Sequence, residues 1–161
     1  MAQFLSILRE EKQRRIEGRP LPNADRNWAH SFAGRASDFM AEIIGPGWLT
    51  DDWLAWRAFT KTLFNEYLYD EELQVFRKCT GLEGPPSGRQ REAWLPVGRR
   101  GGKSRMLAAI AVHLGCCYDW TRYLSPGEIG HVFIVADQLK HTTPILHYVK
   151  GFLFGHPRLQ K

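Results

Sequence analysis

One glycine-rich segment constrains the fold of this 161-residue chain more than any other feature. Residues 98–104 read Gly-Arg-Arg-Gly-Gly-Lys-Ser, and they lie between a short apolar run at 93–97 and a mostly apolar stretch at 105–118. Glycines at this spacing let backbone N–H groups curl around an anion, and a helix that follows adds the positive end of its dipole. The segment therefore predicts a loop that binds phosphate groups.

The side chains of this loop fit the phosphates of a nucleotide. Lys103 is placed to contact the β- and γ-phosphates, and the adjacent Ser104 hydroxyl is placed to help hold Mg²⁺, so the expected ligand is ATP with Mg²⁺. The usual pattern has its first glycine where this chain has Val97, and an incidental glycine turn is the alternative interpretation. The other loop residues expected to bind the nucleotide are Gly98, Arg99, Arg100, Gly101 and Gly102.

The two arginines add positive charge that a phosphate loop with a single lysine lacks. Either Arg99 or Arg100 could stabilise the transferring phosphoryl group, as an arginine finger does. Ground-state binding of the nucleotide and contact with nucleic acid are the alternatives, and the residue types alone leave the three open.

The pattern around the loop predicts an α/β fold. Residues 93–97 and 131–136 read as apolar strands, and each is followed by a stretch with helical character, at 105–118 and 138–154. Such alternation is typical of a parallel sheet that is covered on both faces. We therefore expect residues 86–161 to form a truncated βαβα unit with about two strands, the start of a P-loop NTPase sheet.

Residues 1–85 are expected to form a helical lead region ahead of that unit. Helical spacing of apolar residues marks short helices at 4–17 and 36–44 and a helical hairpin over 50–80. The aromatic stripe of the hairpin is expected to pack into the core. Gly81 is the expected stop signal for its second helix.

Composition excludes several classes of protein. Apolar residues make up 43% of the chain and charged residues 24%, which is typical of a globular domain and not of a disordered chain or a coiled coil. The longest nearly apolar run, at 106–117, is too short to span a membrane, so no membrane partner is expected. The cysteines form neither a metal-binding spacing nor an even disulfide framework, which indicates the cytoplasm.

Positive charge is concentrated in the second half of the chain. Residues 81–161 carry eleven basic and five acidic side chains, whereas residues 31–80 carry five and eight. A positive half suits a partner that bears phosphate, either a nucleotide or a nucleic acid. An ordinary basic surface is the alternative explanation.

Residues 92–104, Glu-Ala-Trp-Leu-Pro-Val-Gly-Arg-Arg-Gly-Gly-Lys-Ser, resemble the start of the ATPase region in the large subunit of tailed-phage terminases, the motors that package viral DNA. The loop of that family has the form small residue-Arg-Arg/Gln-x-Gly-Lys-Ser/Thr, and this sequence fits it. Residues 53–81 and 135–137 also resemble the family, and the resemblance covers about residues 50–155.

The resemblance implies roles for individual residues and for the whole protein. Lys103 would bind the β- and γ-phosphates, Ser104 would assist Mg²⁺, and Arg99, four residues before Lys103, would be a catalytic arginine. Gln90 would read the adenine. A complete subunit would hydrolyse ATP to package double-stranded viral DNA and would cleave that DNA. Its partners would be the terminase small subunit and the portal protein, in the cytoplasm of a bacterial host that carries the phage or prophage.

Terminase large subunits continue with a Walker B strand that ends in Asp-Glu, a coupling motif and a nuclease domain. Asp137 follows an apolar run here but lacks the adjacent glutamate. We therefore expect an N-terminal portion of such a subunit that binds ATP without hydrolysing it. The alternatives are another P-loop ATPase of helicase type and a non-catalytic basic fragment that binds DNA.

Overall fold

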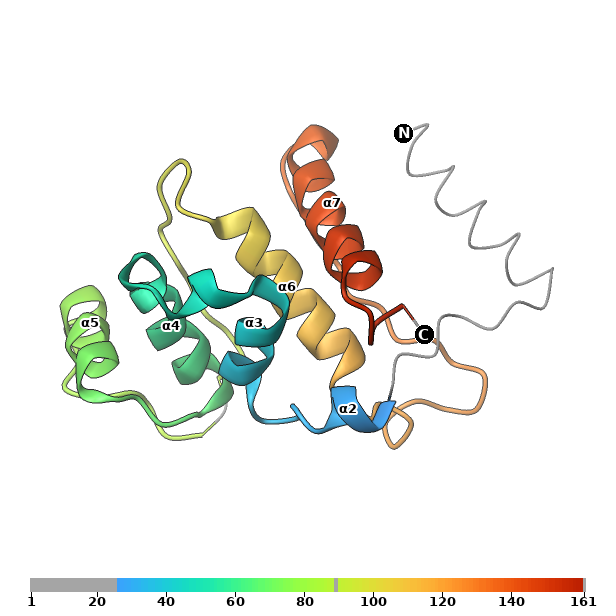
Figure 1. Ribbon diagram of the computed structural model, residues 1–161, viewed down its shortest axis with the longest axis horizontal. Coiled ribbons are helices and arrows are strands. Elements are labelled where there is room, and N and C mark those ends of the chain that lie inside the picture. The colour runs from blue at the N-terminus through green and yellow to red at the C-terminus, as the bar shows by residue number, and fades with distance from the viewer. Residues whose placement is uncertain (1–25, 89, 161) are drawn as a thin grey trace.

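Helices make up all the regular structure in residues 26–88 and 90–160, the residues that the computed structural model describes (Figure 1). The expected helix at 4–17 lies outside them. Two short 3₁₀ turns, η1 (Pro46–Leu49) and η2 (Asp51–Trp53), connect two of the helices. The α-helices are α2 (Arg26–His30), α3 (Ala36–Ile44), α4 (Leu54–Phe64), α5 (Asp70–Thr80), α6 (Lys103–Cys116) and α7 (Leu139–Gly155).

The predicted α/β fold with a P-loop parallel sheet is wrong, because the two expected strands do not pair. Residues 93–97 and 131–136 have no regular secondary structure, and no backbone hydrogen bond between described residues joins them. Trp94 is 87% exposed and Val135 is 89% exposed, so neither segment has the two covered faces of a central strand. Strong β-propensity is a local signal, whereas a ladder requires a neighbouring strand.

The helices at 36–44 and over 50–80 confirm the sequence prediction for the lead region, whereas α2 was not predicted. Helix α3 ends at Gly45, and the expected hairpin over 50–80 consists of η2, α4 and α5. Three acidic residues begin α5, where they interact favourably with the positive end of the helix dipole. Gly81 ends the helix in the left-handed conformation.

The main core surrounds α6, which lies between α3 and α7 (Figure 1). Its buried side chains include Met106, Ala109 and Val112, and they pack against Phe39 of α3 and Ile145 of α7 in one cluster. This cluster therefore draws on both sides of the expected division at residue 85. It also includes Trp48 of η1 and, beyond α7, Leu159.

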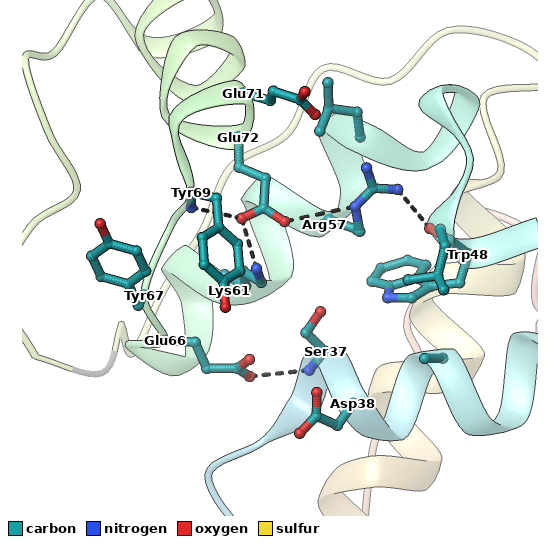
Figure 2. A pocket seen from close by; sticks show the side chains of 13 residues that line it. Ser37, Asp38, Trp48, Arg57, Lys61, Glu66, Tyr67, Tyr69, Glu71 and Glu72 are labelled. Atoms are coloured by element: carbon teal, nitrogen blue, oxygen red, sulfur yellow. Dashed lines mark hydrogen bonds and ion pairs between the residues drawn. The ribbon is translucent and has the colours of Figure 1, made fainter.

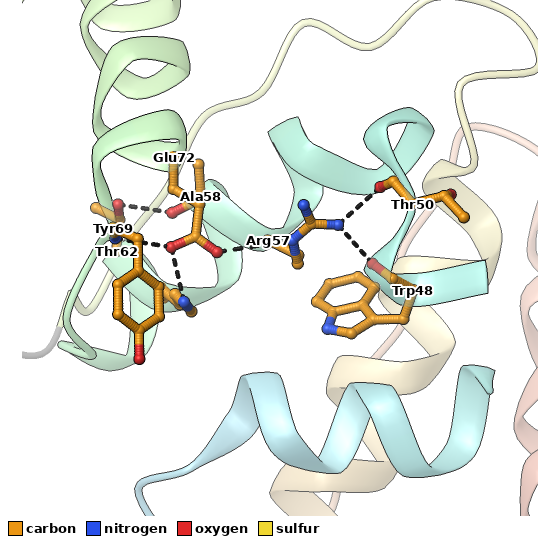
Figure 3. A network of polar contacts seen from close by, with 8 residues as sticks. Trp48, Thr50, Arg57, Ala58, Thr62, Tyr69 and Glu72 are labelled. Atoms are coloured by element: carbon orange, nitrogen blue, oxygen red, sulfur yellow. Dashed lines mark hydrogen bonds and ion pairs between the residues drawn. The ribbon is translucent and has the colours of Figure 1, made fainter. Parts of the chain in front are cut away.

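A buried ionic network joins α4 to α5 (Figure 3). Glu72 accepts the backbone N–H of Tyr69 at 3.0 Å and lies beside Lys61 and Arg57. The Arg57 guanidinium also donates to the carbonyl oxygens of Trp48 and Thr50, each at 2.7 Å. The network therefore fixes the hairpin and the turns that precede it.

Among the described helices, none combines the length and the apolar character that crossing a bilayer requires.

Candidate functional site

The glycine loop leads directly into α6, so the lysine and the serine begin the helix. Gly102 is the residue before the helix, with φ of +79°, and its carbonyl oxygen accepts the N–H of Met106 at 3.0 Å. Lys103 is the first helical residue and Ser104 the second. Because the backbone N–H groups of residues 103–105 precede that first helical hydrogen bond, they have no acceptor inside the helix. The start of α6 therefore offers backbone donors and a positive dipole end to an anion.

Two of the loop glycines are required, Gly101 by its surroundings and Gly102 by its backbone conformation. A Cβ on Gly101 would lie 2.7 Å from Cγ1 of Val97, and one on Gly102 would lie 3.4 Å from Nε1 of Trp56. Gly102 also needs the left-handed region that side chains disfavour. Gly98 has open space around it, so its predicted role in the loop has no steric basis here.

The cations of the loop are exposed. Lys103, Arg99 and Arg100 are all exposed, and none takes part in an ion pair with a described residue. Arg100 has φ of +62°, so it adopts the left-handed region without being a glycine. Arg105 points elsewhere, because it donates to the carbonyl oxygen of Ile44 at 3.2 Å. The loop therefore keeps three cationic side chains available for an anionic ligand.

The sequence analysis missed the tryptophans that contact the loop from α4 and η2. Trp56 donates from Nε1 to the carbonyl oxygen of Gly101 at 2.8 Å, and the ring of Trp53 lies within 3.7 Å of the place of a Cβ on Gly102. Both belong to the aromatic stripe that was expected to pack into the core, and both are partly exposed. Helical spacing gives no sign of a contact between residues 45 positions apart.

An apolar cavity of about 630 Å³ adjoins the loop. It lies between the α4–α5 hairpin and the segment that leads into the loop, and both Gly98 and Gly101 line it. Most of its other lining side chains are apolar, among them Trp56, Phe59, Leu63, Phe76, Leu95 and Val97.

Gln90, the residue predicted to read adenine, lines the same cavity. Its backbone N–H donates to the carbonyl oxygen of Leu63 at 3.1 Å, and its side-chain Nε2 donates to that of Gly88 at 2.7 Å. With its nitrogen engaged in this way, the side-chain oxygen Oε1 is the atom that can accept a hydrogen bond from a ligand.

In residues 26–88 and 90–160, no three His, Cys, Asp or Glu side chains form a group that could hold a metal ion. Oδ1 of Asp137 lies 2.6 Å from Nδ1 of His141, and this hydrogen bond lowers the pKa of Asp137. Ser104 is half-buried at the second position of α6, and its contact with Mg²⁺ stays a prediction.

A second cavity, of about 570 Å³, lies on the other side of α4 (Figure 2). Six of its thirteen lining residues are charged, but the two cations, Arg57 and Lys61, are already paired with Glu72. Glu66 also lines it and accepts the backbone N–H of Ser37 at 3.1 Å. Burial raises the pKa of Glu66 despite that bond.

His113 is fully buried in the core, as the sequence analysis predicts. Its ring contacts Phe39, Phe64 and Tyr118, with centroid separations of 5.2, 4.9 and 5.3 Å. Packing against aromatic rings explains its position in α6.

Comparisons with known proteins give no match for this chain among family models, curated proteins or solved structures. The resemblance of residues 92–104 to terminase large subunits therefore stays a prediction from those residues.

Proposed function

We propose that residues 98–104 bind the phosphate groups of ATP. The observation that carries this proposal is the start of α6, where free backbone N–H groups follow Gly102 and the side chain of Lys103 is exposed beside them. Backbone donors and a helix dipole together favour an anion, and a lysine adds a full charge. Arg99 and Arg100 raise the positive potential further.

The adenine of the nucleotide is proposed to enter the apolar cavity beside the loop. A base needs an apolar surface for its faces and a polar group for its edge. The cavity supplies Trp56 and Phe59 for the first requirement, and Oε1 of Gln90 for an amino group such as that of adenine. The cavity and the loop share Gly98 and Gly101, which is the continuity that base and phosphates need.

Magnesium would reach this site together with the nucleotide. Mg²⁺ commonly keeps several waters and binds through one or two protein groups plus the substrate phosphates. The Ser104 hydroxyl, at the second position of α6, would be its protein contact. When bound, the ion would neutralise phosphate charge.

The resemblance to terminases extends the proposal to DNA packaging. In that role Arg99 and Lys103 would act on the transferring phosphoryl group. Double-stranded viral DNA, the terminase small subunit and the portal protein would be the partners. The surplus of basic residues over 81–161 supports a DNA partner, because Lys and Arg neutralise backbone phosphates.

Isothermal titration calorimetry with ATP tests the central claim. We expect Lys103→Ala to weaken ATP binding by roughly 10- to 100-fold, the effect of losing a charge-assisted hydrogen bond of about 1.5–3 kcal/mol. Lys150→Ala is the matched control, because Lys150 is exposed on α7 and should leave the affinity unchanged.

Equal ATP affinity in wild type and Lys103→Ala would overturn the assignment of the loop. A gel-shift experiment with duplex DNA distinguishes ATP binding from the alternative function, which is DNA binding without a nucleotide. DNA binding by a protein that binds no ATP would favour the non-catalytic DNA-binding interpretation. Turnover of ATP that Arg99→Ala reduces would support the catalytic role of that residue.

A further inference from the structure

The hydrogen bond between Trp56 and Gly101 determines which way one loop carbonyl points. The indole Nε1 of Trp56, on α4, lies 2.8 Å from the Gly101 oxygen, so that oxygen is directed toward α4. Gly101 immediately precedes Gly102 and the free N–H groups that begin α6. A carbonyl oxygen carries partial negative charge, and it would repel an anion if it turned toward the start of the helix.

We propose that Trp56 is a positioning residue for phosphate binding: its indole N–H holds the Gly101 carbonyl against α4 and so keeps the loop in its anion-accepting conformation. Glycine at 101 and 102 leaves the backbone free to rotate, and an unrestrained loop would lose that conformation for part of the time. An external donor reduces this freedom, and pre-organisation of this kind raises affinity without a new contact to the ligand.

The contacts around Gly102 support the same assignment. A Cβ on that residue would lie 3.4 Å from Nε1 of Trp56, an ordinary van der Waals separation, so the indole lies near Gly102 while it donates to the Gly101 oxygen. Trp53 also lies near Gly102 but makes no hydrogen bond to the loop among the described residues. The two tryptophans therefore differ in the single interaction that the proposal requires.

The test compares Trp56→Phe with Trp53→Phe, and it rests on the proposed phosphate site. Inorganic tripolyphosphate is the probe, because it has no base and so reports on the loop alone and not on the cavity that Trp56 also lines. We expect Trp56→Phe to weaken tripolyphosphate and ATP by the same factor, about three- to tenfold for one neutral hydrogen bond. Trp53→Phe, which removes a van der Waals contact near Gly102 but no hydrogen bond, should weaken both ligands by less than Trp56→Phe does.

A spectroscopic signature separates positioning from general support of the fold. The indole N–H resonance of Trp56, assigned by its loss in Trp56→Phe, should shift when tripolyphosphate is added to the wild type and stay in place in Lys103→Ala. Unchanged tripolyphosphate affinity in Trp56→Phe, or a loss confined to ATP, would overturn the role of Trp56 while leaving the phosphate site intact. Failure of the wild type to bind tripolyphosphate would overturn both.

Discussion

The side-chain nitrogen of Lys61 lies 2.7 Å from Oε2 of Glu72, and these residues are only 9% and 4% exposed. Nε of Arg57 lies 3.6 Å from the other oxygen of the same carboxylate. One buried acid therefore compensates two largely buried cations. Removing one partner of such a network leaves charge uncompensated in the interior, which costs more than the network itself contributes.

Replacing Glu72 with alanine should destabilise the protein strongly. We expect Glu72→Ala to lower the free energy of unfolding by about 3–5 kcal/mol, because Lys61 and Arg57 would both lose their buried counter-charge. Urea unfolding followed by circular dichroism measures this change. Glu71→Ala, at the exposed neighbouring position, should stay within about 0.5 kcal/mol of wild type. A loss below about 1 kcal/mol for Glu72→Ala would show that water already solvates the network.

Glu66 should make stability depend on pH in the acidic range. Burial raises the pKa of its carboxyl above the ordinary value of 4.5, so the folded state binds the proton more tightly than the unfolded chain. Stability from this group is therefore present below pH 4.5 and is lost as the pH rises through the raised pKa. The unfolding free energy of wild type relative to Glu66→Gln should fall over that window. A rise instead would mean that the Ser37 N–H bond outweighs burial.

The three cysteines should react with alkylating reagents at very different rates. Burial raises the pKa of the Cys117 thiol to about 12 and also raises that of Cys116, so little thiolate forms near neutral pH. Cys79 is exposed at the end of α5. Iodoacetamide at pH 8 should therefore modify Cys79 first, and mass spectrometry should find the other two modified only after denaturation in urea. Rapid native labelling of Cys117 would contradict its burial.

The absence of strand pairing at 131–136 predicts tolerance to charge. Val135 is 89% exposed, so Val135→Lys should change the free energy of unfolding by less than about 0.5 kcal/mol. Met106→Ala, in the fully buried face of α6, should lower the free energy of unfolding by about 2–5 kcal/mol. Thermal unfolding of both variants measures these changes. A cost for Val135→Lys that matches the core substitution would show that this segment is covered as a strand.

Local signals were enough to predict the described helices other than α2. The acidic residues that open α5, the glycines that close α3 and α5, and the helical spacing of apolar residues all act within one or two turns. The start of α6 was predictable for the same reason, because the sequence Gly-Gly-Lys-Ser specifies both a flexible turn and the first helical residues.

Interactions between distant residues were not predictable in this way. The run at 131–136 has the composition of a strand, but a strand forms only against a partner, and the described chain places none beside it. The same limit applies to the candidate site. Trp56 reads as a core residue of an amphipathic helix, and only the fold brings its N–H to Gly101.

Residues 90–101 are fastened to α4 at both ends, through the Gln90 bond to Leu63 and the Trp56 bond to Gly101. On the helix these two points are about 10 Å apart at 1.5 Å per residue, whereas the segment could extend to about 36 Å. The excess length has to arch away from the helix, and the space beneath the arch is the cavity. The length of this segment, as well as its side chains, therefore sets the size of the molecule that fits in the cavity. Deleting residues within 91–97 would reduce the volume of the cavity.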